Sequence, residues 1–178
     1  MRTTTAIGVT VVAAAALILL LRRYEYQFPQ WLAESEPPRA DLVLVEKAKR
    51  RLSLVRDGEV YRRWRISLGG HPVGHKQREG DQRTPEGRYV LDWRNPDSCC
   101  YKSLHVSYPN DDDRAAAAAR GEDPGGLIMI HGQVNGLGWL GWLGQYIDQT
   151  HGCIAVRNVP MEVIWRAVPD GTPIEIRP

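Results

Sequence analysis

Residues 3–21 carry no charge and are almost wholly apolar, which sets them apart from the rest of the chain. About 20 apolar residues are enough for one helix to cross a bilayer. Arg2 precedes this run and Arg22 and Arg23 follow it, but no small residues of a signal-peptidase site come after the apolar core. We therefore predict a transmembrane anchor, or an uncleaved signal, over residues 1–23.

Residues 24–40 contain Pro29, Pro37 and Pro38 and show no helical or strand period. Such a segment is typical of a spacer, so we expect a stalk between the anchor and a folded body at residues 41–178. The arginines after the span outnumber the one before it, and the positive-inside rule alone would place that body in the cytoplasm.

Composition narrows the class of the body. With 178 residues, the chain has room for one domain beside the tail. A net charge of +2 without a basic, aromatic-interleaved stripe gives no support for nucleic-acid binding, and three cysteines exclude a disulfide scaffold. The 17 glycines and 12 prolines favour turns and short strands over a helical bundle.

Short apolar or alternating runs bounded by turn residues predict a mainly-β domain. Helices are expected only at residues 114–120 and 160–168, the second with Pro160 in its first turn. The fold class is thus a sandwich or a partly closed barrel with two short helices, preceded by the transmembrane helix. Strands are expected at residues 41–48, 51–56, 59–68, 88–93, 103–107, 127–131 and, as an edge strand, 173–176.

Residues 127–158 hold the most informative chemistry. An apolar strand leads to His131 and Gly132, a loop rich in Gly and Trp follows, and the chain then reads Thr150-His151-Gly152-Cys153. A thiol becomes a useful nucleophile near neutral pH when a base or a positive charge lies beside it. Cys153 with a histidine is therefore a candidate nucleophile–base pair, and backbone N–H groups beside Gly152 could hold an oxyanion.

His131 followed by Thr150-His151-Gly152-Cys153 resembles the signature of the L,D-transpeptidase (YkuD-type) catalytic domain. Residues 72–87, 103–110 and 168–178 are similar to the YafK-like murein branch of that family. The resemblance implies a β-rich L,D-transpeptidase-like fold, a periplasmic or cell-wall location and a cysteine acting on peptidoglycan peptides. It implies no metal and no organic cofactor.

The resemblance also implies roles for individual residues. Cys153 matches the nucleophile, His131 the general base and Gly132 the residue that follows it, whereas Thr150, His151 and Gly152 match the turn that shapes the oxyanion site. The spacer from His131 to Thr150 is longer than is usual in the family. Ala155 stands where the family commonly has Arg or Asn, and Arg157, four places after Cys153, is a candidate substrate contact.

Other residues have two readings each. Trp139 and Trp142 wall a mobile lid over the site or pack in the core. The loop at residues 69–87 is too long for a tight turn and contains Lys76, Arg78 and Arg83. These side chains either pair with carboxylates of a stem peptide or face solvent. His105 packs in the interior or contacts substrate. Cys99 and Cys100 are expected to be free thiols, because a disulfide between neighbours is strained.

The function predicted from these features is a cysteine-dependent L,D-transpeptidase that forms a thioacyl-enzyme on peptidoglycan stem peptides. One alternative is a hydrolase that trims peptidoglycan or detaches an envelope lipoprotein, and another is a non-catalytic envelope-binding module. Since the substrate lies outside the cytoplasm, we expect a single-pass protein of the bacterial inner membrane with its body in the periplasm, against the charge rule.

Overall fold

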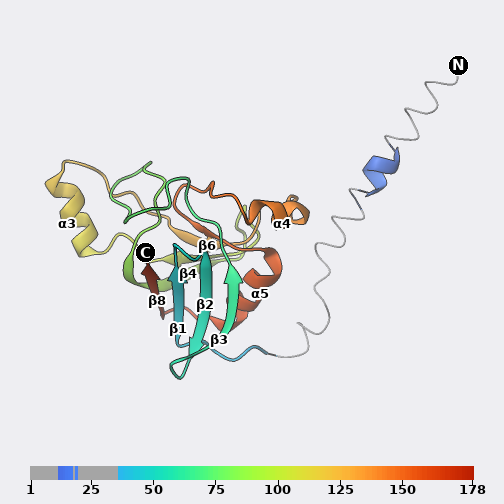
Figure 1. The fold of residues 1–178 in the computed structure, drawn as a ribbon, viewed down its shortest axis with the longest axis horizontal. Helices are drawn as coiled ribbons and strands as arrows, with labels where there is room; N and C mark the ends of the chain where they lie inside the picture. The colour runs from blue at the N-terminus through green and yellow to red at the C-terminus, as the bar shows by residue number, and fades with distance from the viewer. Residues whose placement is uncertain (1–11, 18, 20–35) are drawn as a thin grey trace, which may run out of the picture. The chain divides into compact units, whose positions relative to one another are not determined.

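The structure is a computed structural model that describes residues 12–17, 19 and 36–178 (Figure 1). The chain divides into two compact units, Met1–Ser35 and Glu36–Pro178. In the first unit, residues 12–17 are helical and exposed. Most of the predicted anchor and the predicted stalk up to residue 35 lie outside the described residues, and within the described ones no helix has the length and apolar character to span a membrane.

The second unit is built on one eight-stranded sheet with the order β3-β2-β1-β8-β4-β5-β6-β7. The mainly-β prediction is therefore confirmed. The strands are β1 (Leu42–Glu46), β2 (Arg51–Arg56), β3 (Glu59–Arg65), β4 (Gly87–Asn95), β5 (Ser103–Val106), β6 (Met129–His131), β7 (Ile154–Ala155) and β8 (Thr172–Arg177).

The alternation of apolar and polar residues explains which face of the sheet is buried. In β1, Val43 and Val45 are fully buried while their neighbours are partly exposed, and β8 buries Ile174 and Ile176 in the same way. β1 and β8 pair in parallel with Val43 opposite Ile174, so the buried side chains of both strands enter one core.

The prediction of residues 173–176 as an edge strand is wrong, because β8 lies between β1 and β4. Pro173 has no N–H for a ladder, and proline is ordinarily confined to edge strands or strand starts. Pro173 pairs with Val90 of β4, whereas the pairing with β1 starts one residue later, at Ile174. The proline therefore stands where only one neighbouring strand is present.

The sheet curls until its outer strands approach each other. Ser67, just after β3, forms an antiparallel bridge with Ala155 of β7, with N–H···O distances of 3.0 and 2.9 Å between the two residues. The outermost strands β3 and β7 are thus linked through this bridge, and the sheet is a half-barrel. The part of the chain that the structure describes contains no second sheet. Of the two predicted architectures, the partly closed barrel therefore agrees with the structure and the sandwich does not.

Two helices match the predictions, with earlier starts. α3 (Asp111–Ala119) begins three residues before the predicted helix, because Asn110 and Asp113 form a reciprocal capping box. α5 spans Asn158–Ala167. The Gly/Trp loop also contains a 3₁₀ turn, Gly138–Leu140, and the short helix α4 (Gly141–Gly144), which the sequence did not predict. Figure 1 shows α3 and α4 at opposite ends of this unit.

Candidate active site

The sheet brings Cys153 and His131 to the same face. Cys153 directly precedes β7, which pairs in parallel with β6 so that Ile130 lies opposite Ile154. Extending the register by one residue places Cys153 opposite Met129, whose N–H donates to Cys153 Sγ at 3.4 Å. Because side chains alternate along a strand, Met129, His131 and Cys153 share one face of this ladder.

The Cys153 thiol lies in a partly buried position. Its Sγ donates to the carbonyl oxygen of Leu127 at 3.6 Å. Burial raises the pKa of Cys153, and the Met129 hydrogen bond and the positive charge of Lys76 offset this only in part. The resting thiol is therefore protonated at neutral pH, and it needs a base to become a nucleophile.

His131 has the properties of such a base. Its Nδ1 is 2.7 Å from the carbonyl oxygen of Gly132, which can only accept, so Nδ1 carries the proton and Nε2 a lone pair. Burial lowers the pKa of His131, which keeps the ring neutral at pH 7. Within the described residues no hydrogen bond joins His131 to Cys153, a common situation before substrate binds. The two catalytic roles stay predictions.

Thr150 and Gly152 build the turn that presents Cys153. Thr150 Oγ1 donates to the carbonyl oxygen of Cys153 at 2.7 Å and accepts from Gly152 N–H at 3.2 Å. Gly152 has a φ of +121°, and a Cβ there would lie 2.5 Å from the carbonyl oxygen of Arg83. Only glycine fits this position, because the backbone of the long loop packs directly on the turn.

Gly132 is equally confined, since a Cβ would lie 2.7 Å from Asn158 Oδ1 and 2.8 Å from Tyr101 Cβ. Asn158 was not among the predicted site residues. Its Oδ1 accepts from the N–H of Gln133 at 2.8 Å and so ties the segment after His131 to the start of α5. The sequence feature that could have identified Asn158 as a site residue is its position five residues after Cys153.

A cavity of about 260 Å³ lies next to the turn that leads to Cys153, although Cys153 itself does not line it. His151 lines it with an exposed ring. Gly126 also lines it and directly precedes Leu127, the residue whose carbonyl oxygen the thiol contacts. A peptide bound in this cavity would therefore lie close to Cys153. The support role expected for His151 stays a prediction.

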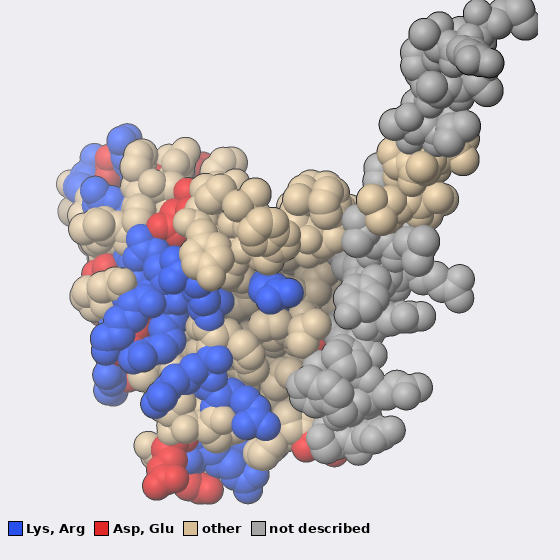
Figure 2. Space-filling model, turned by 45° about the vertical axis from the view of Figure 1, so that its right-hand side comes forward, with Lys and Arg blue, Asp and Glu red and all other residues tan. Residues whose placement is uncertain are grey.

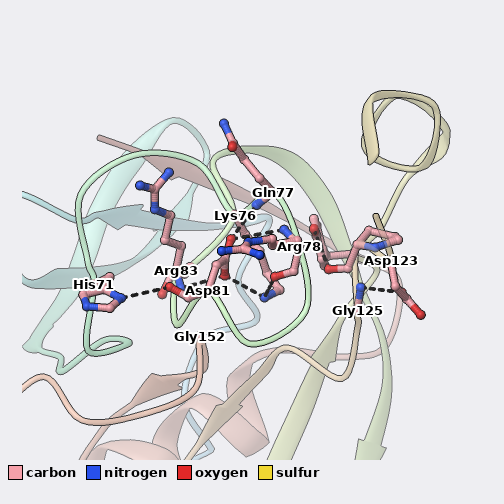
Figure 3. Close-up of polar contacts among 12 residues, drawn as sticks. His71, Lys76, Gln77, Arg78, Asp81, Arg83, Asp123, Gly125 and Gly152 are labelled. Carbon is pink, nitrogen blue, oxygen red and sulfur yellow. Dashed lines mark hydrogen bonds and ion pairs between the residues drawn. The ribbon is translucent and has the colours of Figure 1, made fainter. Parts of the chain in front are cut away.

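Lys76 is buried and already paired. It is 3% exposed, and its Nζ donates to Asp81 Oδ1 and to the carbonyl oxygen of Arg78, both at 2.9 Å (Figure 3). Asp81 also accepts from three backbone N–H groups, those of Gln77, Arg78 and Arg83. Lys76 thus shapes the loop and does not lie on a solvated face, while its contact with substrate stays a prediction.

The side chain of Arg83 is directed away from Asp81 (Figure 3). Arg83 is half-buried as a residue, and no acceptor for its guanidinium is found among the described residues. Its own carbonyl oxygen lies against Gly152, but its side chain lines a different hollow, with His71, and not the cavity that Lys76 and His151 line. Its contact with substrate stays a prediction. Arg78 is exposed and lies 3.7 Å from Glu122.

Trp142 and Arg157 lie close to each other in the fold. Both line a second pocket, formed with residues of β3, and neither lines the cavity next to the turn before Cys153. Trp142 is 60% exposed and Trp139 is 38% exposed, so the core-packing alternative is wrong for both. Their position in a loop that covers substrate stays a prediction.

The remaining candidates have structural partners. His105 Nδ1 lies 2.6 Å from Asp92 Oδ1, and its ring stacks on Trp93 with centroids 4.8 Å apart, which favours the packing alternative. Cys99 and Cys100 are free thiols with their sulfur atoms 3.3 Å apart, and burial raises the pKa of Cys100 to about 12. Among the described residues no cluster of three His, Cys, Asp or Glu side chains could hold a metal.

Comparison with known proteins agrees with this geometry. The family model of the L,D-transpeptidase catalytic domain, YkuD, matches residues 40–176. The chain therefore belongs to the L,D-transpeptidase catalytic domain family.

Individual relatives extend this result. The Escherichia coli (strain K12) protein YafK is 36% identical over 114 residues, which are 60% of this chain and 44% of YafK. The helical cell shape determining protein Pgp2 from Campylobacter jejuni is 27% identical, with a TM-score of 0.59 over 85% of this chain and 55% of Pgp2. An L,D-transpeptidase from Xylanimonas cellulosilytica, 19% identical with a TM-score of 0.52, covers 84% of this chain and 70% of that one and shares the fold. The chain spans about half the length of YafK and Pgp2.

Proposed function

We propose that this chain is a cysteine-dependent L,D-transpeptidase that acts on peptidoglycan stem peptides through a thioacyl-enzyme. The observation that carries the proposal is the placement of Cys153 and His131 on one face of the β6–β7 ladder, with the His131 Nε2 lone pair free. Membership of the family and the cavity next to the turn before Cys153 support it.

In the first half-reaction, His131 Nε2 takes the proton of Cys153, and the sulfur attacks the carbonyl carbon that follows an L-centred residue of a stem tetrapeptide. Backbone N–H groups of the turn at residues 151–153 stabilise the oxyanion. The C–N bond to the terminal D-residue breaks, and His131 returns its proton to the leaving amine. The product is a thioester on Cys153 and a free D-amino acid.

In the second half-reaction a nucleophile attacks the thioester. An amine of another stem peptide, a D-amino acid or an envelope lipoprotein gives transfer, and water gives hydrolysis. We favour transfer because Trp139, Trp142 and Leu143, in the loop between His131 and Cys153, are exposed apolar side chains that could cover bound substrate and exclude water. Hydrolysis remains the second candidate, because it shares the first half-reaction and differs only in the nucleophile that attacks the thioester.

We further propose that residues 3–21 anchor the chain in the bacterial inner membrane and that the body faces the periplasm. The uncharged run and the extracytoplasmic substrate support this placement. A reporter fused after Pro178 should be active in the periplasm. Activity of the reporter only in the cytoplasm would overturn the proposal.

Product analysis tests the reaction. The full chain is incubated with disaccharide-tetrapeptide, with and without a D-amino acid, and the products are identified by mass spectrometry. Cross-linked dimer or an exchanged terminal residue would support transfer, whereas tripeptide formed at the same rate with or without the amine would establish the hydrolase. Products from the Cys153→Ala variant would refute the thiol mechanism. No product from the unmodified chain would favour the non-catalytic module.

A further inference from the structure

The second pocket has a volume of about 390 Å³ and lies where β3, α4 and the start of α5 meet. We call it the arginine–aromatic pocket, because Arg63, Arg65, Arg157, Trp142 and Tyr146 line it together with Gln145. It shares no lining residue with the cavity next to the turn before Cys153. The reaction proposed above therefore leaves it without a role.

The positive charge of this pocket is not neutralised. Within the described part of the chain, no carboxylate forms an ion pair with Arg63, Arg65 or Arg157. Arg65 donates to the carbonyl oxygen of Gln145 at 3.2 Å and lies 4.5 Å over the Tyr146 ring, contacts that orient its charge but do not cancel it. Figure 2 shows lysine and arginine side chains gathered on one face of the molecule, with few acidic groups between them.

The start of α5 adds to this field. α5 has ten residues, begins at Asn158 and has no acidic residue in its first turn. Its N-cap residue, Arg157, makes no capping hydrogen bond through its side chain. The partial positive charge of the helix start lies at the wall of the pocket, where it favours an anionic group.

Gln145 indicates which kind of anion fits. It is 4% exposed, its Nε2 donates to the carbonyl oxygen of Ala155 at 3.1 Å, and its Oε1 has no partner among the described residues. A buried acceptor without a donor is unfavourable, so a ligand that brings an N–H group to this oxygen is favoured. A peptide supplies both carboxylates for the arginines and N–H groups for such an acceptor, whereas a phosphate group supplies mainly acceptors.

The aromatic walls suit a ligand with apolar parts. Trp142 is 60% exposed and Tyr146 is 68% exposed, so both rings offer a flat apolar face to an incoming molecule. Exposed aromatic side chains beside arginine are typical of binding sites, because the rings contribute contact area at a low entropic cost.

We propose that the arginine–aromatic pocket binds a second carboxylate-bearing stem peptide of polymeric peptidoglycan, next to the stem that reacts at Cys153. This inference rests on the proposed function for the identity of the polymer. Gln145 connects the two sites, since it bonds to Ala155, two residues after Cys153. Binding two stems of one strand raises the effective concentration of the reacting stem at the thiol.

The test measures binding of the full chain to insoluble peptidoglycan, with every chain carrying Cys153→Ala so that no chemistry interferes. Arg63→Glu or Arg157→Glu should each weaken binding by about tenfold or more, because each removes a charge-assisted contact. Arg62→Glu is the matched control: Arg62 is exposed on the same strand and lies outside the pocket. It should change binding by less than about twofold.

Several results would overturn the inference. Equal losses for Arg62→Glu and Arg63→Glu would mean a general charge effect, and unchanged binding after amidation of the peptidoglycan carboxylates would mean that carboxylates are not recognised. Phosphatidylglycerol vesicles serve as a competitor. If they release the chain with an intact pocket from peptidoglycan but do not release the Arg63→Glu variant, the pocket binds lipid phosphates instead. The proposed function fails separately, if the chain with Cys153 intact gives no product from disaccharide-tetrapeptide.

Discussion

Lys47 offers a quantitative test of how the long loop is held against the site. It is 2% exposed, and its Nζ donates to the carbonyl oxygens of Gly74 and Thr84 at 2.6 and 2.9 Å and to Glu86 Oε1 at 2.8 Å. One side chain, directly after β1, thereby ties down both halves of the loop whose Arg83 carbonyl oxygen meets Gly152.

Lys47→Met keeps most of the side-chain volume and removes all three bonds. Removing one partner of a buried ion pair costs about 3–5 kcal/mol of unfolding free energy. The Glu86 side chain is 19% exposed and keeps some hydration, so we expect the lower end, about 3 kcal/mol. For a body of this size that loss lowers the melting temperature by roughly 10 °C.

The measurement is urea unfolding of the full chain, followed by tryptophan fluorescence. Lys49→Met is the matched control, because the Lys49 side chain is 61% exposed and its pair with Glu46 lies at the surface. Such a pair contributes about 0–1 kcal/mol. If Lys47→Met and Lys49→Met have free energies of unfolding within about 1 kcal/mol of each other, the loop is not held in the way described here.

The other predictions concern the site itself. His131→Ala should lower the rate of Cys153 acylation by about 10²–10⁴-fold, measured by intact mass, and an undiminished rate would remove His131 as the base. Because burial lowers the pKa of His131 from 6.5, the ring loses its lone pair only in acid, so the acidic limb of kcat/KM should lie below pH 6.5. A limb above that value would mean another group titrates. Gly152→Ala should abolish acylation, since its Cβ would lie 2.5 Å from the Arg83 carbonyl oxygen. Acylation of this variant at the unmodified rate would contradict the packing of the long loop on the turn.

The parts of the fold that could be predicted depend on local signals. β2 has the predicted bounds, Arg51–Arg56, because apolar residues and a following Asp57-Gly58 turn define it within a few residues. The interior position of β8 and the bridge between Ser67 and Ala155 could not be predicted in this way. Both depend on pairing between segments far apart in the chain, which no local pattern records.

The same distinction applies to the site. The motif around Cys153 and the strand ending at His131 identified the candidate pair, because the chemistry of both residues is local to their segments. Burial of Lys76 beside Asp81 was not predictable, since a loop lysine is ordinarily exposed. The arginine–aromatic pocket also escaped prediction, because it joins β3 to residues about 80 positions later in the chain.

The central claim is that Cys153 carries the acyl group in the reaction. The most direct test is rapid acid quench of the full chain with disaccharide-tetrapeptide, followed by peptide mapping. The account predicts a transient adduct on Cys153 with the mass of the donor minus its terminal D-residue, formed much more slowly in His131→Ala. Turnover of the donor without any adduct on Cys153, or an adduct on Cys99 or Cys100 instead, would contradict it.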